Sequence, residues 1–150
     1  ANMAEHYTEK LLPFSQKQLF DLVADVEAYD QYLPWIDAAR ITKRQDNIIF
    51  ADLAIHFRGV RGKYSSKVNL DANSNIITVE LASGPFHHLN QTWTFKKKGS
   101  KTLVGFDIDF KLRNPIFEKM VDFMFDDAVE KMMAAFEGQA NMLYNCVNIT

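Results

Sequence analysis

The side chains in this sequence that could carry acid–base or metal chemistry are few and scattered. Histidine occurs four times, and two copies, His87 and His88, are adjacent in a predicted strand. Neighbouring residues of a strand point to opposite faces, so these two cannot chelate one ion. His6 and His56 stand alone, outside any metal-ligand spacing. We expect all four at the surface or at strand ends, and no metal site is predicted.

Nucleophiles and paired carboxylates give no stronger signal. The sequence contains no glycine-rich phosphate loop, nucleophile elbow or HExxH motif. Cys146 has no neighbouring base, and as the single cysteine it cannot form an intramolecular disulfide, which is typical of a reducing compartment. Asp107 and Asp109 share the outward face of a predicted strand, where solvated carboxylates are expected. No catalytic residue is predicted, and an enzyme is unsupported.

Residues suited to binding an apolar ligand are more prominent. Five of the six methionines fall in the last predicted helix, at positions 120, 124, 132, 133 and 142. Methionine is flexible and polarisable, and it adapts to irregular apolar surfaces. Two interpretations stay open: the methionines fill the core, or the helix lines a cavity for a bulky apolar ligand. Phe123 and Met133 lie off the main apolar stripe, and we expect them to be exposed in a membrane or partner contact.

A cluster of four lysines surrounds Gly99 at a predicted turn: Lys96, Lys97, Lys98 and Lys101. One interpretation is that these lysines only keep an exposed turn solvated. The alternative is a contact with anionic lipid headgroups or with RNA. The net charge of the chain is −2. There is thus no overall basic field to attract nucleic acid, and no DNA partner is predicted.

About the central half of the chain is predicted to form strands. From about residue 37 to residue 112, apolar and polar residues alternate with a period of two. Turn residues interrupt the alternation at Gly59, "DANSN", "SGP" and "KKGSK". A further short strand, "HYTEKLLPF", precedes them. The pattern predicts an antiparallel sheet of six to seven strands with one buried face.

Helices flank the strands on both sides. Ser15 and Gln18 form a capping box for a helix that buries Leu19, Phe20, Val23 and Val26. Pro34 then ends the helical stretch. Asn114 and Pro115 begin a second helix that runs to about Asn145, ~45 Å at 1.5 Å per residue. We expect one stripe of it to face the sheet: Phe117, Val121, Met124, Ala128, Met132, Ala135, Gln139 and Met142.

Length and composition bound the class of protein. A chain of 150 residues, 47% of them hydrophobic, is expected to form one domain over residues 1–150. The longest apolar run, "MMAAF" at 132–136, is far shorter than the ~20 residues of a transmembrane helix. The first ten residues resemble neither a signal peptide nor an amphipathic leader. An α+β fold, with the long helix across one face of the sheet, is predicted.

Taken together, these segments resemble one family. Tyr29, Tyr32, Leu33, Pro34 and Trp35 form a pattern similar to that of the coenzyme Q-binding START-domain proteins and their bacterial relatives, the ribosome association toxins. "LFDLVADVEAY", "ADLAIHF", "SSKV", "GPFHHLNQTWTF" and "AVEKMMAAFEGQA" are similar too, over residues 6–145. The resemblance implies a helix-grip (START/Bet v1-like) fold, a curved sheet wrapped around a long C-terminal helix. It also implies a carrier that binds ubiquinone or a related isoprenoid lipid in a hydrophobic tunnel, in support of respiratory electron transfer.

A quinone carrier needs aromatic rings, apolar walls and a few polar contacts to the quinone carbonyls. Tyr29, Leu33 and Trp35 are expected at the mouth of the tunnel, where they form a lid, and Gln91 is the candidate polar contact. The other expected lining residues are Tyr64, Leu89, Trp93, Phe106, Phe110, Phe117, Val121, Met124 and Met132. Three positions depart from the family pattern, namely Tyr32, Ile36 and Gly62.

Two other functions remain open at this point. The first is a toxin that binds the ribosome and blocks association of its subunits, against which the net charge of −2 argues. The second is a polyketide cyclase-like enzyme, which would need several polar groups inside the cavity. The expected location is the bacterial cytoplasm, peripheral to the inner membrane, or the matrix side if the protein is mitochondrial.

Overall fold

The computed structural model describes residues 4–145 of the chain, so Cys146 lies outside the described residues. The elements follow one another as β1 (Ala4–Leu12), α1 (Gln16–Ala24), the 3₁₀ helix η1 (Val26–Gln31), β2 (Ile36–Gln45), β3 (Ile48–Phe57), β4 (Val60–Asp71), β5 (Ile76–Ser83), β6 (Phe86–Lys98), β7 (Lys101–Leu112) and α2 (Pro115–Tyr144).

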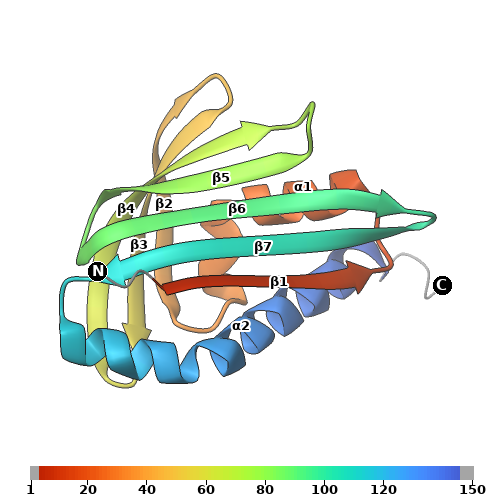
Figure 1. Ribbon diagram of the computed structural model, residues 1–150. Coiled ribbons are helices and arrows are strands. Elements are labelled where there is room, and N and C mark those ends of the chain that lie inside the picture. The colour runs from red at the N-terminus through yellow and green to blue at the C-terminus, as the bar shows by residue number, and fades with distance from the viewer. Residues whose placement is uncertain (1–3, 146–150) are drawn as a thin grey trace.

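All seven strands form one antiparallel sheet in the order β1-β7-β6-β5-β4-β3-β2. Strands β2 to β7 are a series of consecutive hairpins, and the last of them, β7, pairs on its other side with β1 from the start of the chain. Register shifts interrupt the pairing of β2 with β3, of β4 with β5 and of β6 with β7. Such bulges bend the strands. Figure 1 shows the helices on one side of the sheet, with α2 running along its length.

Local sequence signals explain where both α-helices begin. The Ser15 hydroxyl accepts a hydrogen bond from the Gln18 amide, and the Gln18 side chain accepts one from the Ser15 amide. The predicted capping box is therefore confirmed. At α2, the Asn114 side chain accepts hydrogen bonds from the amides of Ile116 and Phe117. The predicted bounds of this helix, from Asn114 and Pro115 to about Asn145, are also confirmed.

The buried face of α2 differs from the predicted stripe. Phe125, Met133, Phe136 and Ala140 are the buried residues of this helix, whereas Met142 is 58% exposed. Met133 was expected to be exposed, and this expectation is wrong, since the residue is 5% exposed. Phe123, by contrast, is 92% exposed, as predicted. Each buried residue lies one position after a residue of the predicted stripe, so the covered face is turned by about 100° from the prediction, because contacts with the sheet decide which face of the helix is buried.

The interior is well packed at one end of the sheet. There, α1 packs against α2 and β6, and the Phe20 and Phe95 rings meet at 5.7 Å between centroids. The Thr102 hydroxyl donates to the Phe14 carbonyl, and the Tyr144 hydroxyl donates to the Gln18 carbonyl. Figure 1 shows α1 behind the end of the sheet where β6 and β7 join. The first half of α2 lies near the other end.

Candidate functional site

A cavity of about 570 Å³ lies between the sheet and the first half of α2. This volume falls in the range of ~300–1,000 Å³ that is usual for small-molecule sites. Its walls come from the loop before β2, the β3–β4 hairpin, the start of β6, the end of β7 and α2. The lining residues are Trp35, Ile36, Ile55, His56, Phe57, Val60, Arg61, Gly62, Lys63, Tyr64, Pro85, Phe86, Leu89, Gln91, Ile108, Phe110, Leu112, Asn114, Phe117, Val121, Phe125 and Ala128.

The register of β6 against β7 marks where the cavity ends. Two inward pairs, Leu89 with Phe110 and Gln91 with Ile108, line it. The next inward pair, Trp93 with Phe106, lies outside it, and both residues are buried. The rings of this pair are 4.4 Å apart between centroids. The layer formed by Trp93 and Phe106 therefore separates the cavity from the packed end of the core.

Phe136 of α2 extends this layer. Its ring makes edge-on contacts with Trp93 at 5.4 Å and with Tyr29 and Tyr32 at 5.7 Å each. The Tyr29 hydroxyl donates to the Val23 carbonyl. The Tyr32 hydroxyl is buried and has no hydrogen-bond partner within residues 4–145. Burial raises the pKa of both tyrosines well above the ordinary value of 10.0.

Seven of the thirteen predicted ligand-binding residues line the cavity: Trp35, Tyr64, Leu89, Gln91, Phe110, Phe117 and Val121. The cavity wall does not include the other six, which are Tyr29, Leu33, Trp93, Phe106, Met124 and Met132. Tyr29, Leu33 and Met132 are half-buried and pack against the core instead. Of the three residues expected to form a lid, only Trp35 reaches the cavity.

Trp35 has an unusual backbone conformation. Its φ of 69° is in the left-handed region, which costs a non-glycine residue about 1–2 kcal/mol. The conformation follows Pro34 and directs the chain into β2, where the His56 amide donates to the Trp35 carbonyl at 3.0 Å. The indole packs against Phe57 of the β3–β4 hairpin at 5.7 Å between centroids. The pair lies at the cavity wall.

Six polar side chains line the cavity, of which His56, Arg61, Lys63 and Asn114 are exposed, whereas Tyr64 and Gln91 are half-buried within the apolar wall. Burial raises the pKa of Tyr64 to about 12, so its hydroxyl is neutral near pH 7. The Trp93 indole nitrogen donates to the Gln91 side-chain oxygen at 3.4 Å. An indole can only donate, so this contact directs the amide oxygen toward Trp93 and leaves the NH₂ group as a donor for another partner. Both side chains can therefore donate to an oxygen atom inside the cavity.

Hairpin and loop residues at the cavity were missed by the sequence analysis. Phe57, Arg61 and Lys63 come from the two strands joined by the Arg58–Gly59 turn. Pro85 lies in the turn between β5 and β6, and Phe86 begins β6. Gly59 was a predicted turn residue between two alternating strands, and glycine suits the φ of 81° that it adopts. It identifies the turn but not its approach to the cavity, because that depends on the bend of the sheet.

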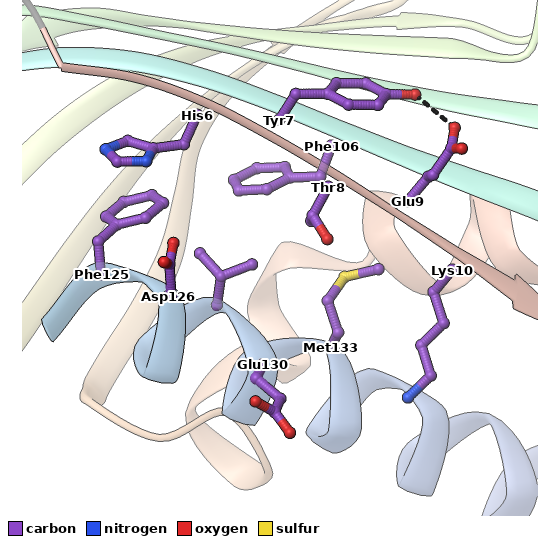
Figure 2. Close-up of a pocket in the computed structure, with 11 residues that line it drawn as sticks. His6, Tyr7, Thr8, Glu9, Lys10, Phe106, Phe125, Asp126, Glu130 and Met133 are labelled. Atoms are coloured by element: carbon purple, nitrogen blue, oxygen red, sulfur yellow. Dashed lines mark hydrogen bonds between the residues drawn. The ribbon is translucent and has the colours of Figure 1, made fainter.

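A second hollow, of about 400 Å³, lies between β1 and α2 (Figure 2). Phe106, predicted for the tunnel, lines this hollow. Figure 2 shows the His6 ring stacked on Phe125, with centroids 3.9 Å apart. Phe125 lines both hollows and stands between them. Because Glu9, Lys10, Asp126 and Glu130 also line it, the second hollow suits an apolar tail less well than the first.

Three histidines lie closer to acids than the sequence suggested. Nitrogen–oxygen distances are 3.6 Å from His6 to Asp122, 2.6 Å from His56 to Asp37 and 2.8 Å from His88 to Asp109. The His56–Asp37 pair lies at the edge of the cavity and is about half exposed. Asp109 therefore pairs with His88 across β6 and β7, although it faces outward as predicted. Within residues 4–145, no three acidic, histidine or cysteine side chains form a metal-binding group.

Comparison with known proteins agrees with this architecture. Residues 12–137 match the family described as "Polyketide cyclase / dehydrase and lipid transport". The chain belongs to this family. It also superimposes on a START superfamily protein from Mycobacterium smegmatis with a TM-score of 0.82 and 24% identity, over 95% of this chain and 99% of that one. The predicted helix-grip fold is thereby confirmed.

Two relatives within the family carry names that bear on binding. The ribosome association toxin RatA of Rickettsia prowazekii is 39% identical over 134 residues, which are 87% of this chain and 92% of the toxin. The mitochondrial coenzyme Q-binding protein COQ10 homolog B of Xenopus laevis is 26% identical over 144 residues, 93% of this chain and 59% of that protein. Neither relative is named for a catalysed reaction, although the family description includes cyclases and dehydrases.

Proposed function

We propose that this protein binds an isoprenoid quinone, such as ubiquinone, in the cavity beside α2 and acts as a carrier that supports respiratory electron transport. The observation that carries the proposal is the cavity wall, in which aliphatic and aromatic side chains surround two half-buried polar donors, Tyr64 and Gln91. The name of the COQ10 relative supports the same ligand class. A carrier needs no catalytic residue, and we propose none.

The proposed pose follows from the chemistry of the wall. A quinone ring is flat and accepts hydrogen bonds at its carbonyl oxygens, so it fits near the Tyr64 hydroxyl and the Gln91 amide. Tyr64 and Phe86 meet edge-on at 5.7 Å between ring centroids and present aromatic surface at this point. The isoprenoid tail requires only apolar wall, which Leu89, Phe117 and Val121 provide.

Lipid extraction and mass spectrometry of the purified protein test the ligand directly. Ala128 lines the cavity, and an Ala128→Trp substitution places an indole in the space of the ligand. The matched control is Ala134→Trp on the exposed face of the same helix. We expect quinone to co-purify with the wild type and the control and to be absent from Ala128→Trp. A wild-type protein that neither co-purifies with quinone nor binds added quinone would refute the proposal.

Tyr64→Phe tests the polar contact within the same site. Loss of one hydrogen bond of ordinary strength costs ~1 kcal/mol, so quinone affinity should fall about fivefold. An alkyl ligand of similar length without carbonyl oxygens should bind both proteins equally. Equal quinone affinity of Tyr64→Phe and the wild type would remove Tyr64 from the site and leave the cavity assignment standing.

A second candidate function is favoured by the identity with the RatA relative. In this alternative the protein binds the ribosome and blocks association of its subunits. Sucrose-gradient profiles with excess protein test it. Wild type and Ala128→Trp should then both shift the ribosome profile, because a ribosome contact needs the surface and not the cavity. A profile unchanged by the wild-type protein would exclude this activity.

The proposed ligand also determines a proposed location. Quinones reside in respiratory membranes, and we propose a position at the cytoplasmic side of the bacterial inner membrane, or at the matrix side in a mitochondrion. Within residues 4–145, neither helix is long and apolar enough to cross a membrane. Cell fractionation with a salt wash tests the location: a peripheral protein leaves the membrane fraction as ionic strength rises.

A further inference from the structure

Large apolar side chains are exposed beside the opening of the cavity. Phe123 and Ile116 of α2 are 92% and 81% exposed, and Val60, which lines the cavity, is 44% exposed. Phe123 follows Ile116 by seven residues, so both lie on one face of the helix. That face is turned away from the cavity, since neither residue lines it. Figure 1 shows the start of α2 and the β3–β4 hairpin at the same end of the molecule, and exposed apolar groups of this size at one end mark an interaction surface.

Basic side chains surround these apolar groups. Arg58, Arg61 and Lys63 belong to the β3–β4 hairpin, Arg113 directly precedes α2, and Lys119 lies between Ile116 and Phe123. Within residues 4–145, none of these five cations is in a salt bridge. This local excess of positive charge contrasts with the net charge of −2 for the whole chain.

Three nearby carboxylates, those of Asp37, Glu118 and Asp122, offset part of this charge and leave an excess of two cations over anions. Asp37 and Asp122 lie against His56 and His6. The Glu118 carboxylate accepts a hydrogen bond from the Leu112 amide at the β7–α2 junction. The further acids of α2, from Asp126 onward, follow Phe123 and mark the limit of the basic region.

We propose that this surface, formed by Arg58, Val60, Arg61, Lys63, Arg113, Ile116, Lys119 and Phe123 and called here the mouth surface, docks on a membrane that contains anionic phospholipid. The apolar side chains enter the boundary between headgroups and acyl chains, and the cations contact the phosphates. This proposal deepens the proposed carrier function and rests on it, because the purpose of the docking is transfer of a lipid ligand. A ligand of the cavity then passes between the bilayer and the cavity without crossing water.

A bilayer fits the mouth surface better than RNA does. The mouth surface is also better placed for docking than the turn of four lysines around Gly99. Of its three exposed apolar side chains only Phe123 has a ring on which a base could stack, whereas all three, Val60, Ile116 and Phe123, can enter an acyl layer. Lys96, Lys97, Lys98 and Lys101 lie at the opposite ends of β6 and β7 from the cavity. A membrane bound there would lie far from the opening.

Vesicle flotation tests the docking, with phosphatidylcholine vesicles that either contain or lack phosphatidylglycerol. The wild type should float only with anionic vesicles. The double substitution R61Q/K63Q should lower binding about 30-fold, because each basic residue at such a surface is worth ~1 kcal/mol. Phe123→Ser should lower it at least tenfold, because a buried phenylalanine contributes ~1.5–3 kcal/mol. The controls K96Q/K97Q and Met142→Ser, which alter exposed residues away from the mouth surface, should float like the wild type.

Two results would overturn the docking proposal. One is equal flotation with neutral and anionic vesicles, and the other is loss of flotation in K96Q/K97Q but not in R61Q/K63Q. Binding of RNA by the wild type that is lost in R61Q/K63Q, without any vesicle binding, would assign the surface to RNA instead. Quinone binding in detergent solution separates the two proposals, because Phe123→Ser should retain it. Vesicle binding without quinone binding would refute the carrier function and leave the docking intact.

Discussion

Trp35 provides the sharpest test of how the chain forms the cavity, through two substitutions that remove the same ring. Complete burial makes a Trp→Ala change cost ~3–5 kcal/mol, and since Trp35 is half-buried we expect Trp35→Ala to cost about 2 kcal/mol. Trp35→Gly removes the ring and also the strain of a φ of 69°. Relief of the backbone strain stabilises the folded state by ~1–2 kcal/mol. This gain outweighs the ~0.4–1 kcal/mol of stability that is lost because glycine is more flexible in the unfolded chain. Trp35→Gly should therefore be more stable than Trp35→Ala by about 1 kcal/mol.

Ligand affinity should respond differently from stability. Both variants lose the same aromatic surface at the cavity wall, so both should bind quinone at least tenfold more weakly, by the ~1.5–3 kcal/mol that a buried aromatic contributes. Denaturant unfolding can be followed by the fluorescence of Trp93, because the chain has two tryptophans and Trp93 is the buried one. Titration with a quinone in detergent gives the affinity.

Two outcomes would refute this reasoning about Trp35. If Trp35→Ala is as stable as Trp35→Gly, the residue does not adopt the left-handed conformation. If both variants bind quinone as the wild type does, the indole belongs to the core and not to the site.

Three further predictions concern the tyrosines and the long helix. In denaturant unfolding, Tyr32→Phe should raise the free energy of unfolding by about 1 kcal/mol because it removes a buried hydroxyl without a partner. Tyr29→Phe should lower it by about 1 kcal/mol because it removes a hydrogen bond. Equal effects of the two substitutions would contradict the assigned contacts. The pKa of Tyr64 is raised from 10.0 to about 12, so its contribution to stability is complete below pH 10 and is lost as the pH rises to about 12. The difference in phenolate absorbance between the wild type and Tyr64→Phe should therefore show a titration near pH 12. A titration near pH 10 would show instead that the hydroxyl is solvated. Met133→Ala should cost ~2–5 kcal/mol, whereas Met142→Ala should cost almost nothing, because the first residue is buried and the second is 58% exposed; the reverse order would restore the apolar stripe predicted from the sequence.

Local patterns in the sequence predicted the elements well. Ser15, Gln18 and Asn114 determine the helix starts through hydrogen bonds to residues two or three positions away. The alternation in β7, from Val104 to Leu112, assigns the inward face correctly. These features depend on neighbours in the chain, so a single sequence contains the information.

The composition of the cavity wall was predicted only in part. Trp93 and Phe106 share the inward face with Leu89 and Phe110, and no pattern in the sequence distinguishes them. The difference arises because Phe136 and α1 pack over one end of the sheet and leave the other end open. The buried face of α2 deviates for a related reason, since contacts with the sheet and not the apolar pattern alone decide which face is covered, which brings Met133 inward and leaves Met142 outward.

The sequence by itself determined the order of elements, the two capped helices, the inward faces of the strands and the family resemblance, because each depends on residue types at short, fixed spacings. Tertiary structure alone decided which inward residues line a cavity and which fill the core. It also turned Trp35 toward the cavity and Tyr29 toward Phe136, and it brought the cations of the β3–β4 hairpin to the same end of the molecule as Ile116 and Phe123. These outcomes depend on sheet bending and helix placement, which arise from contacts between residues far apart in the chain.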